Sequence, residues 1–184
     1  MNTYLALIRG INVGGNKIIK MEELKKAFEK AKFTEVRTYI QSGNVFFVSP
    51  ETKHDILEKQ IQKLILENWG YEVEVMVRTM EEIEEIAKYT PFPKAKLGDN
   101  KILSMYVLFL KTKPDAKTKE LIESFCTAEE KFHIRNSEIY ALIKKNIPNN
   151  GVFAKNLLEK KVKIAMTNRN WLTLGKMVEW NARN

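Results

Sequence analysis

The chain has 184 residues, of which 44% are hydrophobic and 29% are charged, with a formal net charge of +8. This length suits one domain or two small ones, and the composition is typical of a soluble globular protein. No segment approaches the ~20 consecutive apolar residues that cross a bilayer, and a single cysteine, Cys126, excludes an internal disulfide, so we expect a cytoplasmic protein with no membrane partner.

Hydrophobic periodicity divides the first part of the chain into six elements. The opening apolar run has no basic leader or cleavage site, so it is interpreted as a buried strand and not as a signal peptide. Ser42-Gly43-Asn44 has the composition of a hairpin turn. The elements predicted here are strands at 4–9, 36–41, 45–48 and 71–78, and helices at 21–32 and 53–68. Their order is β-α-β-β-α-β.

The second part of the chain repeats this order. Its predicted elements are strands at 102–110, 131–135, 138–143 and 162–166, helices at 117–125 and 152–160, and a last helix at 171–180. A Glu-rich helix and a loop connect the two parts. We therefore predict an α+β protein of two tandem ferredoxin-like (βαββαβ) units. The predicted segments are 1–78, a bridge at 79–101, and 102–184 with the C-terminal helix.

This topology predicts which loops become neighbours. A right-handed crossover makes the first two strands of a unit parallel, with the third strand between them. The loop after the first strand, 10–20, and the turn after the second strand, 41–44, then lie at one edge of the sheet. The first and third strands are apolar on both faces, so we expect the second face of the sheet to be covered too.

Two long motifs carry a resemblance to a known family. They are Arg9–Gly15 (RGINVGG) and Thr38–Val45 (TYIQSGNV), and two further segments, PFP at 91–93 and TNRNW at 167–171, also fit. Over nearly its whole length the chain resembles the bacterial family catalogued as domain of unknown function 1697. The resemblance implies a small, duplicated αβ protein with no established biochemical function and no agreed catalytic residues. The chain departs from the family pattern at Gly151-Val152, where a Ser-Lys pair is usual, and at Leu172, where a polar residue is common.

The Gly-rich loop and the hairpin turn form the candidate ligand site. Backbone N–H groups of such a loop bind phosphate in other proteins, although the spacing here matches neither a P-loop nor a dinucleotide fingerprint. A tight connection between strand and helix explains the glycines equally well. The candidate ligand-binding residues at this edge are Arg9, Asn12, Gly14, Gly15, Gln41, Ser42, Gly43 and Asn44.

Arg169 is the ninth candidate. It stands just before the last helix, where its charge adds to the positive end of the helix dipole. This arrangement is unfavourable unless an acceptor lies nearby, so we expect Arg169 to pair with a carboxylate, backbone carbonyls or a bound anion. An anion would make Arg9 and Arg169 charge partners of one ligand, whereas a carboxylate would make Arg169 structural.

Three functions fit these residues. The favoured hypothesis is binding of an anionic ligand, which is a nucleotide, a phosphorylated metabolite or a nucleic acid. The second is an enzyme that works without metal or cofactor, although neither loop contains an Asp, Glu or His to act as a base. The third is a protein-interaction module. One cysteine and two separated histidines, His54 and His133, predict no metal site.

Overall fold

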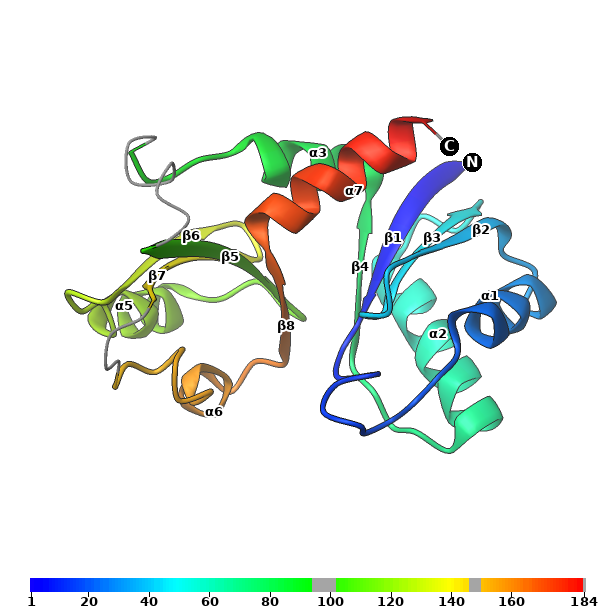
Figure 1. The fold of residues 1–184 in the computed structure, drawn as a ribbon, viewed down its shortest axis with the longest axis horizontal. Helices are drawn as coiled ribbons and strands as arrows, with labels where there is room; N and C mark the ends of the chain where they lie inside the picture. Colours follow the sequence, from blue (N-terminus) through cyan, green and yellow to red (C-terminus); the bar gives the residue numbers. More distant parts are fainter. Residues whose placement is uncertain (94–101, 146–149, 184) are drawn as a thin grey trace. The chain divides into compact units, whose positions relative to one another are not determined.

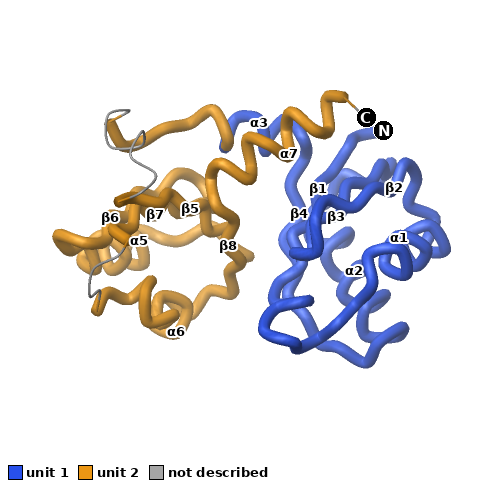
Figure 2. The backbone as a smooth tube through the Cα atoms, viewed as in Figure 1, with its two compact units in different colours: residues 1–86 blue, residues 87–184 orange. Residues whose placement is uncertain are grey.

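The chain forms two compact units, residues 1–86 and 87–184 (Figure 2). The structure is a computed structural model that describes residues 1–93, 102–145 and 150–183. Within these residues it contains six helices and two four-stranded antiparallel sheets (Figure 1). The predicted α+β class is therefore confirmed. The predicted segment boundaries at 78 and 101 stay predictions.

The first unit has the predicted order of elements. They are β1 (Asn2–Ile8), α1 (Met21–Lys30), β2 (Thr34–Tyr39), β3 (Asn44–Ser49), α2 (His54–Trp69), β4 (Val75–Thr79) and α3 (Met80–Lys88), which continues to the second unit. The sheet order is β2-β3-β1-β4, and each neighbouring pair is antiparallel. β1 and β2 are therefore parallel with β3 between them, as predicted. The predicted strand at 71–78 begins later, at Val75.

Both faces of this sheet are buried. On one face, alternate residues of the central strands β1 and β3 pack with α1 and α2, around an aromatic cluster of Phe28, Phe33 and Phe47. On the other face Leu5 and Phe46 are also buried. Each such side chain contributes about 1.5–3 kcal/mol when fully buried. The apolar character of both faces, seen in the sequence, is explained by this burial.

The second unit repeats the arrangement. Its elements are β5 (Leu103–Leu110), α5 (Ala116–Ser124), β6 (Glu130–Arg135), β7 (Glu138–Lys144), α6 (Leu158–Val162), β8 (Met166–Asn170) and α7 (Trp171–Arg183). The sheet order is β6-β7-β5-β8, the counterpart of the order in the first unit. α7 follows β8 without an intervening loop (Figure 1).

Two elements of the second unit were predicted wrongly. The helix expected at 152–160 is only the short α6, because residues 151–156 form turns. A buried carboxylate explains this: Glu130 is 0% exposed and accepts from the backbone N–H groups of Phe153 (3.0 Å) and Ala154 (2.8 Å). The closing strand is β8, four residues later than expected, since α6 ends in a left-handed Lys163. Half of the turn predicted at 148–151, residues 148 and 149, lies outside the described residues.

Glu130 also requires a glycine at position 151. A Cβ there would lie 2.1 Å from the carboxylate carbon of Glu130. We expect Gly151→Ala to lower the free energy of unfolding by about 1–3 kcal/mol, as overpacking of a tight site does. Gly175 in α7 is the matched control, because a Cβ there meets nothing within 4 Å. Gly175→Ala should stabilise by roughly 0.5–1 kcal/mol. Urea unfolding of both variants measures the contrast, and equal effects would contradict the steric account.

Asp115 should make the stability of α5 depend on pH in the acidic range. It is the N-cap of this helix, and its Oδ1 accepts from the Thr118 N–H at 2.7 Å. Hydrogen bonds from the Thr118 side chain and backbone hold the pKa of Asp115 below its ordinary 3.8. The ionised cap therefore stabilises the fold above pH 3.8, and this contribution is lost as pH falls through the lower folded-state pKa.

The variant Asp115→Asn tests this contribution. It keeps a capping oxygen but removes the charge. We expect the wild-type protein to melt at a higher temperature than Asp115→Asn at pH 6, and this difference to shrink below pH 3.8. Thermal unfolding of both proteins across pH 2.5–6 measures it. A difference that stays constant with pH would show that the charge of Asp115 plays no part.

Candidate functional site

The Gly-rich loop and the hairpin turn lie side by side, as the topology predicted. Leu7 pairs with Asn44, and the Ile8 N–H donates to the Gly43 carbonyl at 2.8 Å. A Cβ on Gly43 would lie only 2.7 Å from the Ile8 oxygen, and the φ of Gly43 is +70°. The expectation that Arg9 lies next to this turn is thus confirmed. Gly43 is present because two backbones meet at this point.

Residues 12–17 form a small hairpin of their own. Val13 and Asn16 are bridged, with the Asn16 N–H donating to the Val13 carbonyl at 3.0 Å. The two residues between them, Gly14 and Gly15, have φ of +59° and +78°. A two-residue turn of type I′ requires positive φ at both positions. The paired glycines are therefore explained by the turn, and their exposed backbone remains open to solvent.

Asn12 ties this hairpin to the chain that follows it. Its Oδ1 accepts from the Ile19 N–H at 2.8 Å, and its Nδ2 donates to the Ile19 carbonyl at 2.9 Å. Its own φ is +57°, a conformation that asparagine tolerates. Both ends of the side-chain amide are used in this contact, so Asn12 closes the loop.

Ser42 and Asn44 stabilise the neighbouring turn. Asn44 is buried, and its Nδ2 donates to the Ser42 hydroxyl at 2.8 Å and to the Tyr39 carbonyl at 3.3 Å. His54 cannot activate Ser42, because it contacts the ring of Tyr4 at the start of β1, whereas Ser42 follows the end of β2. Ser42 therefore has the geometry of a turn residue and not of a nucleophile.

Exposed groups at this edge are both polar and apolar. Arg9 and Gln41 are exposed at neighbouring strand ends. Beside them Val13, Ile18 and Ile40 are 62%, 63% and 55% exposed. Ile40 has a φ of +47°, which is rare for a β-branched residue and costs on the order of 1–3 kcal/mol. Sequence reasoning missed Ile40, since it placed this residue inside a regular strand.

Arg169 lies in β8 and is buried. Its Nη1 donates to the Thr167 hydroxyl at 2.9 Å and to the Asn168 carbonyl at 2.7 Å. The predicted pairing with an acceptor is confirmed, and the acceptors belong to the chain itself. Burial lowers the pKa of the Arg169 guanidinium from its ordinary value to about 10. The residue was expected in the connection to the last helix, but β8 continues to that helix directly.

The first unit contains a counterpart of Arg169. Arg78 is buried at the next-to-last position of β4, as Arg169 is in β8, and its Nη1 donates to the Val77 carbonyl at 2.8 Å. The residue after each arginine caps a helix: Thr79 Oγ1 accepts from the Glu82 N–H at 3.2 Å, and Asn170 Oδ1 accepts from the Leu172 N–H at 3.0 Å. This repeated geometry favours a structural role for Arg169, and its role in ligand binding stays a prediction.

The described residues contain neither a metal-binding cluster nor a membrane-spanning helix. In residues 1–93, 102–145 and 150–183 no group of three or more His, Cys, Asp or Glu side chains is placed to hold a metal ion. In the same ranges, no helix has both the length and the apolar character that a membrane span requires.

The fold and the site define a protein of two α+β units with a polar loop edge on the first. A family model described as "Protein of unknown function (DUF1697)" matches residues 1–140. The chain therefore belongs to this family, which confirms the resemblance seen in the sequence. Among solved structures it is similar to the conserved bacterial protein SP0830 from Streptococcus pneumoniae, at 21% identity, with 97% of each chain covered and a TM-score of 0.74. No curated protein matches it significantly. At this identity the likeness shows a shared fold alone.

The loop-closing role of Asn12 can be tested. Asn12→Ala should cost about 1–3 kcal/mol, the scale of two hydrogen bonds to the buried Ile19 backbone. Asn12→Gly keeps the left-handed backbone and isolates the loss of the side chain. Asn16→Ala is the control, because Asn16 is exposed and its side chain has no hydrogen bond among the described residues; it should change stability by less than about 0.5 kcal/mol. Chemical denaturation measures all three, and an inert Asn12→Gly would contradict the role.

Proposed function

We propose that this protein binds a small anionic ligand at the loop edge of its first unit. In this proposal Arg9 and Gln41 contact the ligand, and the exposed backbone of Gly14 and Gly15 donates to it. Asn12, Ser42, Gly43 and Asn44 hold the two loops in place. We further infer that both units are ferredoxin-like and arose by duplication, a reading supported by their equal strand orders. We expect the protein to work in the cytoplasm.

The conformation of Ile40 is the observation that carries the proposal. Strained backbone is retained where the surrounding structure enforces it, and such residues cluster at ligand-binding sites. Ile40 is strained, exposed and adjacent to Gln41, and the turn that follows it is fixed by the contact between Gly43 and Ile8. A regular turn would not need this strain, so we assign it to the presentation of Gln41.

The charge of the two loops supports an anion. Segments 9–20 and 38–44 contain Arg9, Lys17 and Lys20 but no Asp or Glu. Lys17 donates to the Glu72 carbonyl, which holds one of these cations against the unit. A local positive potential of this kind attracts anions, and exposed N–H groups of tight turns bind them.

A nucleotide or a phosphorylated metabolite fits better than a nucleic acid. Modules of this topology that bind RNA stack bases on exposed aromatic side chains of the central strands. Here Tyr4, Phe46 and Phe47 in the central strands are all fully buried. The groups left for recognition are therefore those of the loop edge, which suit a compact phosphate group.

An interaction module is the second candidate function, because of the exposed apolar side chains at the same edge. Val13, Ile18 and Ile40 present apolar surface to solvent beside the cations. A protein partner with apolar and acidic groups would match this surface. The enzyme hypothesis is the weaker one, since neither loop supplies a titratable base.

Ligand binding can be tested with Arg9→Ala. We expect ATP or glucose 6-phosphate to raise the melting temperature of the wild-type protein in a thermal-shift assay. Arg9→Ala should weaken the affinity about 10–100-fold, the effect of losing about 1.5–3 kcal/mol of charged hydrogen bonding. Arg183→Ala, which removes an exposed arginine at the other end of the chain, should change nothing. Calorimetric titration gives the dissociation constants.

The remaining outcomes separate the other functions. Stabilisation by heparin with a steep salt dependence would indicate nucleic acid instead. Equal affinities of Arg9→Ala and Arg183→Ala for the anion would show that it binds outside the loop edge. No stabilisation by any of these probes would overturn the proposal and favour the interaction module.

A further inference from the structure

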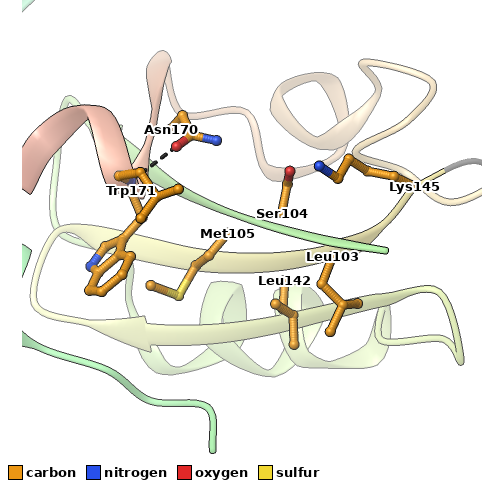
Figure 3. Close-up of a pocket in the computed structure, with 8 residues that line it drawn as sticks. Leu103, Ser104, Met105, Leu142, Lys145, Asn170 and Trp171 are labelled. Carbon is orange, nitrogen blue, oxygen red and sulfur yellow. Dashed lines mark hydrogen bonds between the residues drawn. The ribbon is translucent and has the colours of Figure 1, made fainter. Parts of the chain in front are cut away.

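The second unit contains a small pocket apart from the loops discussed above. It lies at the start of β5, beside Leu142 of β7 and the junction of β8 with α7 (Figure 3). β8 pairs with β5 only between Leu110 and Tyr106. The first three residues of β5 therefore extend beyond their last partner in β8, and they line the pocket.

The lining has an apolar and a polar part. Leu103, Met105 and Leu142 supply apolar surface on one side of β5 (Figure 3). On the other side Figure 3 shows the Lys145 ammonium pointing toward the Ser104 hydroxyl. Asn170 lies on this polar side too. A ligand of this pocket must combine an apolar group with a polar one.

The polar groups that line the pocket favour a ligand that accepts hydrogen bonds. Asn170 uses its Oδ1 to accept from the Leu172 N–H at 3.0 Å, which leaves its Nδ2 as the donor. Trp171 Nε1 is buried without a hydrogen-bond partner among the described residues, but in Figure 3 it points away from Ser104 and Lys145, so it adds no donor to the polar side of the pocket. Lys145 contributes positive charge, and the first turn of α7 adds its own. No Asp or Glu is found among the described residues that line the pocket.

The volume limits the ligand. The pocket holds about 130 Å³, whereas an apolar cavity of roughly 150 Å³ in another protein accommodates benzene. A nucleotide is far larger, since sites for drug-sized ligands measure roughly 300–1,000 Å³. The group that the pocket takes up is therefore about the size of a single aromatic ring with one polar substituent.

From these observations we infer that this pocket is a binding site for a small organic carboxylate that carries a short apolar or aromatic group. The carboxylate faces Lys145 and the Asn170 amide, and the apolar group rests on Leu103, Met105 and Leu142. A bare phosphate matches only the polar part of this lining. The site is independent of the loop edge of the first unit, because every described residue that lines it belongs to the second unit.

Benzoate is a suitable probe, with benzamide as its neutral isostere. Heteronuclear NMR follows the indole N–H signal of Trp171, which Trp171→Phe assigns. We expect benzoate to shift this signal in a saturable manner, and benzamide and inorganic phosphate to bind at least tenfold more weakly. Benzamide or phosphate binding as tightly as benzoate would overturn the inference, as would the absence of a saturable shift. These comparisons use the unaltered protein, so they do not depend on the folding of a variant.

Two variants locate the binding site. Lys145→Met removes the charge at similar size and should weaken benzoate about tenfold, whereas Lys161→Met, at an exposed lysine of α6, should not. Leu103→Trp should fill the pocket and abolish the shift. An unchanged affinity in Lys145→Met or Leu103→Trp would contradict the assignment. Arg9→Ala should bind benzoate normally, which separates this test from that of the proposed function.

Discussion

The pairing of β1 with β3 determines the position of almost every group at the loop edge. Its register ends with Leu7 opposite Asn44, and the next backbone contact joins Ile8 to Gly43. This contact has no room for a side chain, because a Cβ at position 43 would overlap the Ile8 oxygen. The loop after β1 and the turn after β2 are therefore held together by backbone contacts. These contacts do not depend on the identity of the side chains around them.

The two units use the same framework with different second crossovers. In the first unit α2 runs from His54 to Trp69, and its buried Glu58 accepts from the Val77 N–H at 3.0 Å, which satisfies a donor of β4. In the second unit the buried carboxylate comes from β6, and it fixes a series of turns before the short α6. A carboxylate inside each unit thus satisfies backbone donors, but its place in the chain decides whether a long helix forms.

Hydrophobic periodicity predicted the strands correctly where burial alone decides the structure. The central strands β1, β3, β5 and β7 were all predicted, because their apolar runs are bounded by clear turn residues. The helix at 152–160 was wrong, since its pattern contains no sign that Glu130, more than 20 residues earlier, binds the backbone there. Ile40 was missed because β-branched residues rarely adopt a left-handed conformation, so its residue type gives no indication of it.

At the candidate site, sequence reasoning correctly predicted that the two loops lie together, but it did not predict which partners their side chains contact. Asn12 and Asn44 looked like ligand groups because asparagine amides suit that task, yet their amides bind the Ile19 and Tyr39 backbone. Which partner an amide finds depends on where a distant backbone lies, and spacing along the chain does not encode this. Arg169 was misplaced for another reason: the predicted closing strand ended at 166, whereas β8 runs to Asn170 and contains two of the acceptors of Arg169.

The loop edge and the pocket differ in a way that bears on the size of the ligands proposed for them. The loop edge is exposed and contains the strained residue Ile40. It can therefore contact one part of a ligand that is larger than the edge. The pocket is small and has both apolar and polar walls, so it must take up most of whatever it binds. A phosphorylated compound meets the first requirement and fails the second on volume, whereas a small carboxylate can fill the second. The two proposals therefore call for different ligands, and we expect each site to be lost by mutation without loss of the other.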